Sequence, residues 1–456
     1  MRTRRAAGWR GCAGRARVSG VFASARGSVG ALSRDDAPGL GARLTFVCIG
    51  AVAVLWQFPI VLATFQADPL FNYRVQLLLS DLAVGALIVV TAWPVRFARP
   101  PQVGRATLLW AGVCGMVAAA AVVHSSALAA QTLLRDLGTL AIAFAIAHRI
   151  APNALRPLAL VLATGTLFQL VLGTAQVLHG APLGLAFLGE FADPLLPYGD
   201  ALAPRGTLGH AYMLAALSLL ATAVVIAASL RSSGSRRWIG AAAALAMPVG
   251  MTFSRAGVVA ALLLGVTLAR AGLWRVLMLV AIAVIAPATI ASAGWLEQID
   301  KTFVERPQDA PTSRGTLVEQ AVELIRREPL FGVGPGSYLP VLRKVETDPA
   351  RRVALQPVHD VPLLEAAEAG IPAGMLAAAI VVLALVRAAR RGPQGLVAAV
   401  YVPFLVFDQF LISEPQGLVL LGIWLGASDA LGRRAEAPWS HPQATARSGT
   451  AASPLR

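Results

Sequence analysis

The residues best suited to chemistry are two arginines and a histidine placed around the longest polar interruption of an otherwise apolar chain. The interruption covers residues 294–360 and contains Arg314 and, at its end, His359, just before an apolar segment. Arg255 lies earlier, in the sequence TFSRAG between two apolar segments. Guanidinium groups can bind phosphate oxygens through two parallel hydrogen bonds, and a neutral imidazole can accept a proton near pH 7. This set predicts a site that holds a phosphorylated substrate and moves a proton.

The sequence around His359 is that of a helix start. Asp360 follows as a good N-cap, and Pro362 is tolerated in a first helical turn. An imidazole near the positive end of a helix dipole is favoured in its neutral form, which a general base requires. Glu365 or Glu368, on the same predicted helix, could orient the ring. A structural role for the histidine is the alternative.

Arg255 is predicted to lie at the tip of a short hairpin of apolar segments. The flanking segments have about 16 and 14 residues, and at ~1.5 Å per residue each reaches roughly 24 Å, less than the ~30 Å hydrocarbon core. The tip should therefore lie below the outer membrane surface. A charge at that depth indicates a functional site. The alternative is a structural arginine that reaches up to the lipid headgroups or forms an ion pair with a carboxylate.

Within the polar interruption, Ser313 is predicted to cap a helix from Arg314 to about Arg327, which Pro329 ends. Apolar residues along one face predict that this helix lies on the membrane or packs across the membrane-spanning segments. The following FGVGPGSY contains three glycines, Gly332, Gly334 and Gly336. Their amides could approach an anion closely, although a plain turn has the same composition. No Lys-Ser/Thr follows, so the pattern is not a nucleotide-binding P-loop.

The composition indicates a polytopic membrane protein. Of the 456 residues, 56% are hydrophobic and 14% charged, against ~25% charged in soluble domains. The net charge of +15 is mostly due to arginine. Basic residues cluster in short loops between apolar segments, which is the pattern that orients membrane proteins and not one for nucleic acid. Three cysteines, Cys12, Cys48 and Cys114, show no metal-ligand spacing. No disulfide framework can be read from them either.

The apolar segments predict an all-α fold of about twelve transmembrane helices, since about twenty apolar residues span a bilayer. The predicted spans are 44–67, 75–95, 106–123, 132–147, 157–178, 208–230, 238–253, 256–269, 276–293, 361–386, 395–412 and 417–431.

Every second loop is basic, and this alternation predicts the orientation. The basic residues are Arg96, Arg99, Arg105, Arg149, Arg156, Arg231, Arg236, Arg237, Arg270, Arg275, Arg387, Arg390, Arg391, Arg433 and Arg434. The positive-inside rule then places both termini in the cytoplasm, with residues 180–207 and 294–360 outside. The tails 1–43 and 432–456 are predicted to be disordered and cytoplasmic.

Four pieces in order resemble the O-antigen ligase/polymerase family of bacterial surface-polysaccharide enzymes. They are RGTLGHAYMLA (205–215), TFSRAG (252–257), SRGTLVEQAVELIRREPLFGVGPGSY (313–338) and VHDVPLLEAAEAGIPAGML (358–376). The long outer loop also falls where the family has it, between predicted spans nine and ten. The resemblance covers roughly residues 205–376. The first five predicted spans share only their general apolar character with the family.

The resemblance implies a GT-C-like glycosyltransferase of the bacterial inner membrane. Such an enzyme moves a glycan from undecaprenyl diphosphate to an acceptor hydroxyl on the outer face, inverting the anomeric configuration, without a nucleotide sugar or a metal. The implied partners are the lipid-linked donor, a glycan or lipid A-core acceptor, and membrane lipids.

The resemblance also implies roles for individual residues. The catalytic residues would be His359, Arg255 and Arg314, with the two arginines holding the diphosphate and His359 taking the acceptor proton. The residues implied in substrate binding are Arg205, His210, Gly334, Gly336 and Glu368. The chain departs from the family at Asp360, where asparagine or a similar residue is usual, and at His210, in a stretch that often carries asparagine.

Two alternatives stay open. One is a twelve-span secondary transporter such as a flippase, although we find no internal repeat of the kind those folds show. The other lies within the family, where the enzyme could polymerise repeat units, ligate finished chains to lipid A-core or glycosylate a protein.

Overall fold

The computed structural model describes residues 40–67, 74–92, 103–149, 155–193, 195–198, 201–231, 237–291, 313–353, 355–390 and 392–432. Most of both predicted tails and the first part of the polar interruption lie outside the described residues. So do six of the basic loop residues, Arg96, Arg99, Arg236, Arg391, Arg433 and Arg434.

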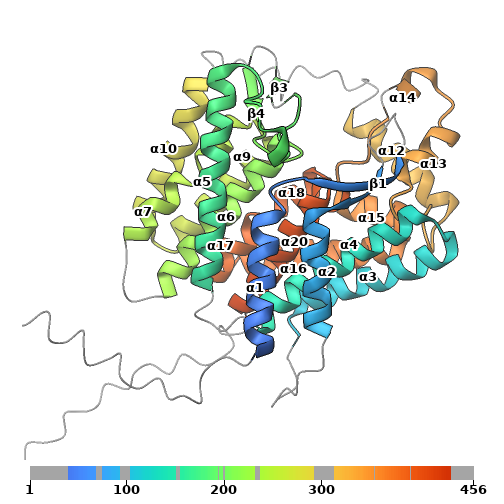
Figure 1. Cartoon of the computed structure of the whole chain (residues 1–456), viewed down its shortest axis with the longest axis horizontal. Coiled ribbons are helices and arrows are strands. Elements are labelled where there is room, and N and C mark those ends of the chain that lie inside the picture. The colour runs from blue at the N-terminus through green and yellow to red at the C-terminus, as the bar shows by residue number, and fades with distance from the viewer. Residues whose placement is uncertain are drawn as a thin grey trace, which may run out of the picture.

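The described residues are mainly helical (Figure 1). In chain order the elements are α1 (Leu40–Leu55), β1 (Val61–Ala67), β2 (Arg74–Leu78), α2 (Leu79–Ala92), α3 (Arg105–His124), α4 (Ala127–Phe144) with a π-helical turn (Ala145–Arg149), α5 (Leu155–His179), a 3₁₀ turn (Ala186–Leu188), β3 (Leu195–Tyr198), β4 (Ala201–Pro204), α6 (Ala211–Arg231), α7 (Arg237–Ala244), α8 (Met247–Met251), α9 (Arg255–Arg270), α10 (Trp274–Ala291), α12 (Arg314–Arg327), α13 (Tyr338–Val345), α14 (Pro349–Val353), α15 (Val361–Ala369), α16 (Ile371–Ala388), α17 (Pro393–Ala399), α18 (Val402–Phe407), α19 (Phe410–Ser413) and α20 (Pro415–Gly432).

Five described helical segments are long and apolar enough to cross a membrane: Arg105–His124, Ala127–His148, Leu155–His179, Ala211–Leu230 and Ile371–Ala388. The prediction of a mainly helical, multi-pass membrane protein is therefore confirmed. The count of twelve is not confirmed, and it stays a prediction.

The predicted spans 44–67 and 75–95 are partly wrong, because the end of the first and the start of the second are β-strands and not helix. Helix α1 ends at Leu55, and residues Val61–Ala67 pair antiparallel with Arg74–Leu78 as the hairpin β1–β2. Pro59 lacks the amide hydrogen that a continuing helix needs, and the β-branched residues that follow favour a strand. Hydropathy alone cannot separate such an apolar strand from an apolar helix.

Three other predicted spans are interrupted. The span 361–386 is two helices, α15 and α16, which meet at Gly370 in a left-handed conformation with φ 94°. The span 238–253 divides into α7 and α8, and the span 395–412 divides into α17, α18 and α19. Each break places backbone termini, and the side chains beside them, within the packed bundle.

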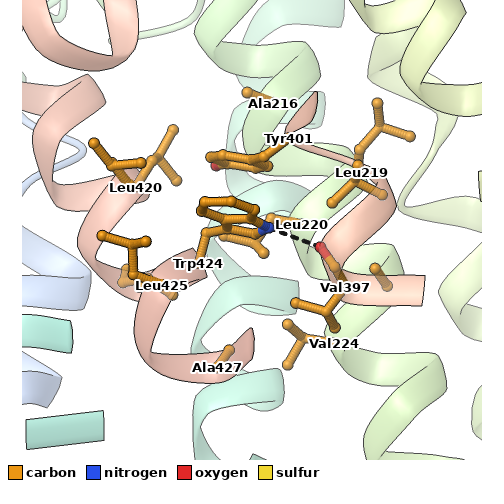
Figure 2. Close-up of a cluster of buried hydrophobic side chains, with 14 of the residues drawn as sticks. Ala216, Leu219, Leu220, Val224, Val397, Tyr401, Leu420, Trp424, Leu425 and Ala427 are labelled. Carbon is orange, nitrogen blue, oxygen red and sulfur yellow. Dashed lines mark hydrogen bonds between the residues drawn. The ribbon is translucent and has the colours of Figure 1, made fainter. Parts of the chain in front are cut away.

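Helix α6 forms the centre of the core, because nearly all of its side chains between Ala211 and Ala228 are buried. The indole of Trp424 on α20 stacks on Tyr401 with ring centroids 5.3 Å apart, and its Nε1 donates to the Val397 carbonyl at 2.8 Å (Figure 2). Leu219 and Leu220 of α6 lie beside the stacked pair (Figure 2). This contact joins α6, α17 and α20 in one rigid unit.

The described end of the polar interruption folds as predicted. The Ser313 hydroxyl accepts a hydrogen bond from the Thr316 amide, and the helix runs from Arg314 to Arg327. A second hydrophobic cluster, which includes Leu317, Leu324 and Tyr338, packs this segment against α15. Helices α12, α13 and α14 lie together at the upper right of Figure 1.

Candidate functional site

His359 lies immediately before α15, in the conformation that the sequence predicts for a helix start. The Asp360 carboxylate accepts from the Leu363 amide at 2.8 Å and so caps the helix. The side chain of His359 is 29% exposed, so one part of the ring can reach a bound molecule. Its Nε2 atom lies 3.4 Å from Oε1 of Gln356.

Asp408 faces the other ring nitrogen of His359. Its Oδ1 atom lies 3.9 Å from His359 Nδ1, and its side chain is only 6% exposed. The backbone places this carboxylate, since Asp408 is the C-cap of α18 and accepts from the Gln409 amide at 2.9 Å. The sequence analysis did not single out Asp408. The available signal was one acidic residue inside the apolar segment 395–412, where a charge is costly and marks a functional site.

Arg314 is brought to the same end of α18. Its guanidinium donates to the Phe407 carbonyl at 3.3 Å and lies 5.1 Å from the centroid of the Phe407 ring. Phe407 directly precedes Asp408, so Arg314 and His359 converge there. The side chain of Arg314 is exposed and keeps donors available for an anion.

Arg205 and His210 lie on the loop between β4 and α6. Arg205 donates to the carbonyls of Gly209, at 3.3 Å, and of Asp193, and its guanidinium lies 4.3 Å from the Phe191 ring centroid. The Tyr212 amide donates to Nδ1 of His210 at 3.2 Å, which leaves the proton of a neutral ring on Nε2.

The electrostatic surroundings of His210 place it in the group around Asp408. Burial lowers the pKa of His210, Asp408 opposes this shift, and the charges of Arg205 and His359 add to it. The lowered pKa favours the neutral, hydrogen-bonding form of His210. Burial also lowers the pKa of Arg205, and the nearby Asp193 opposes this shift.

Buried glutamines hold this loop in place. The Gln169 side chain on α5 both accepts from the Thr207 amide at 3.0 Å and donates to its hydroxyl at 2.8 Å. Gln416 at the start of α20 accepts from the Gly209 amide at 2.7 Å and donates to the Trp56 carbonyl at 3.0 Å. Gly206 has φ 62°, and a Cβ there would collide with Gln169 Oε1. The loop is thus fixed by α5, by α20 and by the residues that follow α1.

Arg255 is the first residue of α9, and Ser254 caps that helix by accepting from the Gly257 amide at 3.0 Å. Helix α9 packs against α18, whose end carries Phe407 and Asp408. The short α8 and the left-handed Phe253, at φ 50°, produce the turn that the sequence predicts before Arg255. Arg255 is half-buried, as expected for a hairpin tip within the packed bundle.

Gly334, Gly336 and Glu368 form a separate group at the other end of α15. The Glu368 carboxylate accepts from the amides of Gly336, at 2.8 Å, and Tyr338, at 3.2 Å. The Gly334 amide donates to the Glu368 carbonyl at 3.0 Å. Since nine residues of helix measure roughly 13 Å, Glu368 is remote from His359. The glycine turn here binds a carboxylate of its own chain.

Close packing and backbone conformation explain why this turn contains glycines. Both have positive φ, 103° at Gly334 and 69° at Gly336, and a Cβ would press on the His124 ring and on Leu128 of the α3–α4 hairpin. Burial raises the pKa of Glu368 to about 7, and the two amide hydrogen bonds oppose this rise. The turn therefore fastens α12 and α13 to α15 and to α3.

Within the described part of the chain, no three His, Cys, Asp or Glu side chains converge as metal ligands would. His359, Asp408 and Arg314 meet at the end of α18, and His210 interacts electrostatically with Asp408, His359 and Arg205; we call these five residues the α18-end cluster. Two cations, a buried carboxylate and two imidazoles can bind an anion and accept a proton.

Residues 240–378 match the family model described as O-antigen ligase. The match includes Arg255, Arg314 and His359, and it confirms the resemblance that the sequence motifs indicated. The comparison with curated proteins gave no match. The chain is thus similar to the O-antigen ligase family over residues 240–378, and its described part contains five helices long and apolar enough to cross a membrane.

Proposed function

We propose that the protein transfers a glycan from undecaprenyl diphosphate to an acceptor hydroxyl, on the outer face of the bacterial inner membrane. The observation that carries this proposal is the α18-end cluster. Two residues of the matched O-antigen ligase segment, Arg314 and His359, meet at the end of a helix outside that segment, beside the buried Asp408.

The donor chemistry fits this arrangement. A lipid diphosphate is a weakly basic leaving group, so its departure needs stabilisation of negative charge more than a strong acid. Arg314 and Arg255 supply guanidinium groups that can bind diphosphate oxygens in pairs. Arg205, held by the glutamine-fixed loop, adds a third cation for the phosphate or the glycan.

The proton follows a short path in this proposal. The acceptor oxygen forms a bond to the anomeric carbon, and the bond from that carbon to the diphosphate oxygen breaks with its electron pair. His359 takes the proton of the acceptor hydroxyl, and Asp408 stabilises and orients the resulting imidazolium. A single displacement of this kind inverts the anomeric configuration. No nucleotide sugar, metal or cofactor takes part.

The membrane arrangement of the proposal is the one predicted from the basic loops. Both termini face the cytoplasm, about twelve segments cross or enter the bilayer in a GT-C-like arrangement, and the α12–α14 segment lies outside. The substrate-binding roles of Gly334, Gly336 and Glu368 become indirect, because their contacts within the chain hold α12 and so Arg314 in position.

Deletion of the protein in its own cell distinguishes a glycan transferase from a glycan transporter. If it transfers glycan, lipid-linked glycan accumulates on the outer face of the membrane. Accumulation on the inner face would instead identify a flippase and contradict the proposal.

Variants of Arg255 or His359, with the polysaccharide analysed by size, then separate the reactions within the family. Shortened chains identify a polymerase, whereas chains of normal length that stay unattached identify a ligase. A glycoprotein that loses its glycan identifies a protein O-glycosyltransferase.

A further inference from the structure

A cavity of about 170 Å³ opens where α3 and α17 begin and α16 and α20 end. It is lined by Arg105, Arg387, Arg390, Gln394 and Asp429, among others. Arg387 follows the start of α16 by sixteen residues, or roughly 24 Å of helix. The cavity is therefore at the opposite end of α16 from α15 and the α18-end cluster.

One arginine of the cavity has its charge neutralised inside the bundle. Arg387 Nη2 lies 2.7 Å from Asp429 Oδ1, and the two side chains are 8% and 0% exposed. The other Asp429 oxygen accepts from the amide and the hydroxyl of Thr107, at 2.8 and 2.7 Å. This pair is a fully hydrogen-bonded part of the wall, so it needs no ligand.

In contrast, the other polar groups of the cavity have charges and hydrogen-bonding capacity that a ligand could satisfy. Three arginines against one carboxylate leave two positive charges uncompensated among its lining residues, and Arg105 and Arg390 are exposed. Gln394 is 6% exposed, and its Oε1 atom has no hydrogen-bond partner among the described residues. A buried acceptor left without a donor costs free energy, which a bound hydroxyl or amine would recover.

The wall beside these groups is apolar and open. Val103 and Val386 line the cavity and are 43% and 50% exposed, and Val382 continues the apolar surface along α16 at 59% exposed. Apolar side chains next to uncompensated cations suit a molecule with an anionic head and hydrocarbon tails. A soluble anion would use only the cations.

We propose that this cavity binds the phosphodiester headgroup of an anionic membrane phospholipid. The phosphate lies between Arg105 and Arg390, and a hydroxyl of the headgroup donates to Gln394 Oε1. The acyl chains run along Val103, Val386 and Val382. Basic pockets between membrane helices bind lipid headgroups in this way. The site is separate from glycan transfer, and in the orientation proposed above it serves the cytoplasmic leaflet.

Native mass spectrometry of the full chain, delipidated and titrated with phosphatidylglycerol, tests the site. Each juxtamembrane charge is worth about 1 kcal/mol, or roughly fivefold in affinity. Arg390→Ala should therefore weaken phosphatidylglycerol binding roughly fivefold, and Arg390→Glu, which changes the charge by two, roughly 25-fold. Gln394→Leu should weaken it without a change of charge. Arg275→Glu is the matched control, because Arg275 is an exposed arginine in the first turn of α10 that does not line the cavity.

Three results would overturn the proposal. Equal losses in Arg275→Glu and Arg390→Glu would mean only general surface attraction. Unchanged binding in a folded Arg390→Ala protein would remove the site. Displacement of phosphatidylglycerol by millimolar inorganic phosphate would identify a phosphate-ion site instead of a lipid site, whereas displacement only by other anionic lipids supports the lipid.

Discussion

Nδ1 of His359 lies 3.9 Å from Oδ1 of Asp408, across the contact between α15 and α18. The distance is longer than a hydrogen bond, and contacts of this kind commonly shorten when substrate binds. Asp408 is buried and held by the Gln409 amide, so a shorter contact would require the ring to move toward the carboxylate. Such a movement would leave Nε2 free for an acceptor hydroxyl.

Asp408→Asn should lower the rate of glycan transfer while leaving donor binding almost unchanged. A charge-assisted contact is worth about 1.5–3 kcal/mol, so kcat should fall roughly ten- to hundredfold. Steady-state kinetics with the lipid-linked donor would separate the two constants. A rise in KM with unchanged kcat would assign Asp408 to substrate binding and not to His359.

Part of this site could be predicted from the sequence because local signals determine it. Ser313 and Asp360 cap the helices predicted to follow them, and both predictions are confirmed. Asp408 was missed because only the folding of α15 against α18 makes it a neighbour of His359. Similarly, no local sequence signal indicates that the amides of the glycine turn bind Glu368, because Gly336 and Glu368 are 32 residues apart.

The helix count illustrates a second limit. Hydropathy predicted apolar segments correctly, but Pro59 and Gly370 decide that two of them are not single helices. The loop before α6 likewise depends on distant residues, because Gln416 and Gln169 accept from its amides and only the tertiary structure brings them together.

Arg255→Lys should lose most of the transfer activity although the charge is kept. A lysine is a point cation and cannot reproduce the paired hydrogen bonds of a guanidinium on a diphosphate. Loss of one such donor set commonly costs roughly 10²-fold in rate. Transfer assays on the folded variant check this, and full activity would reduce Arg255 to an anchor for lipid headgroups.

Glu368→Gln should alter how stability depends on pH. The folded protein binds the Glu368 proton with a pKa of about 7, against 4.5 in an exposed glutamate. The folded state is therefore favoured at low pH, and this contribution is lost as the pH rises from 4.5 through about 7. Thermal unfolding of both proteins between pH 5 and 8 should show a larger fall in Tm for the unsubstituted protein.

A hydrogen bond lost in Glu368→Gln would lower Tm by the same amount at every pH. The slope of Tm against pH therefore separates the titration of Glu368 from the loss of a hydrogen bond. Parallel curves for the two proteins would mean that Glu368 does not titrate in this range.

The orientation of the chain can be measured by reporter fusions. Fusions at Arg237 should report the cytoplasm, and fusions at Asp348, in the segment between α13 and α14, should report the outer side. A cytoplasmic signal at Asp348 would place the α18-end cluster on the side opposite to the one proposed.

The most direct test of glycan transfer centred on His359 is single-turnover release of undecaprenyl diphosphate by the purified protein with a lipid-linked glycan and an acceptor. The account predicts release that depends on the acceptor, and a fall of roughly 10²–10⁴-fold in His359→Ala with donor binding retained. His359→Gln, which can hydrogen-bond but cannot accept the proton, should be nearly as slow. Release at the normal rate by His359→Gln would show that the histidine only positions substrate, and would contradict the account.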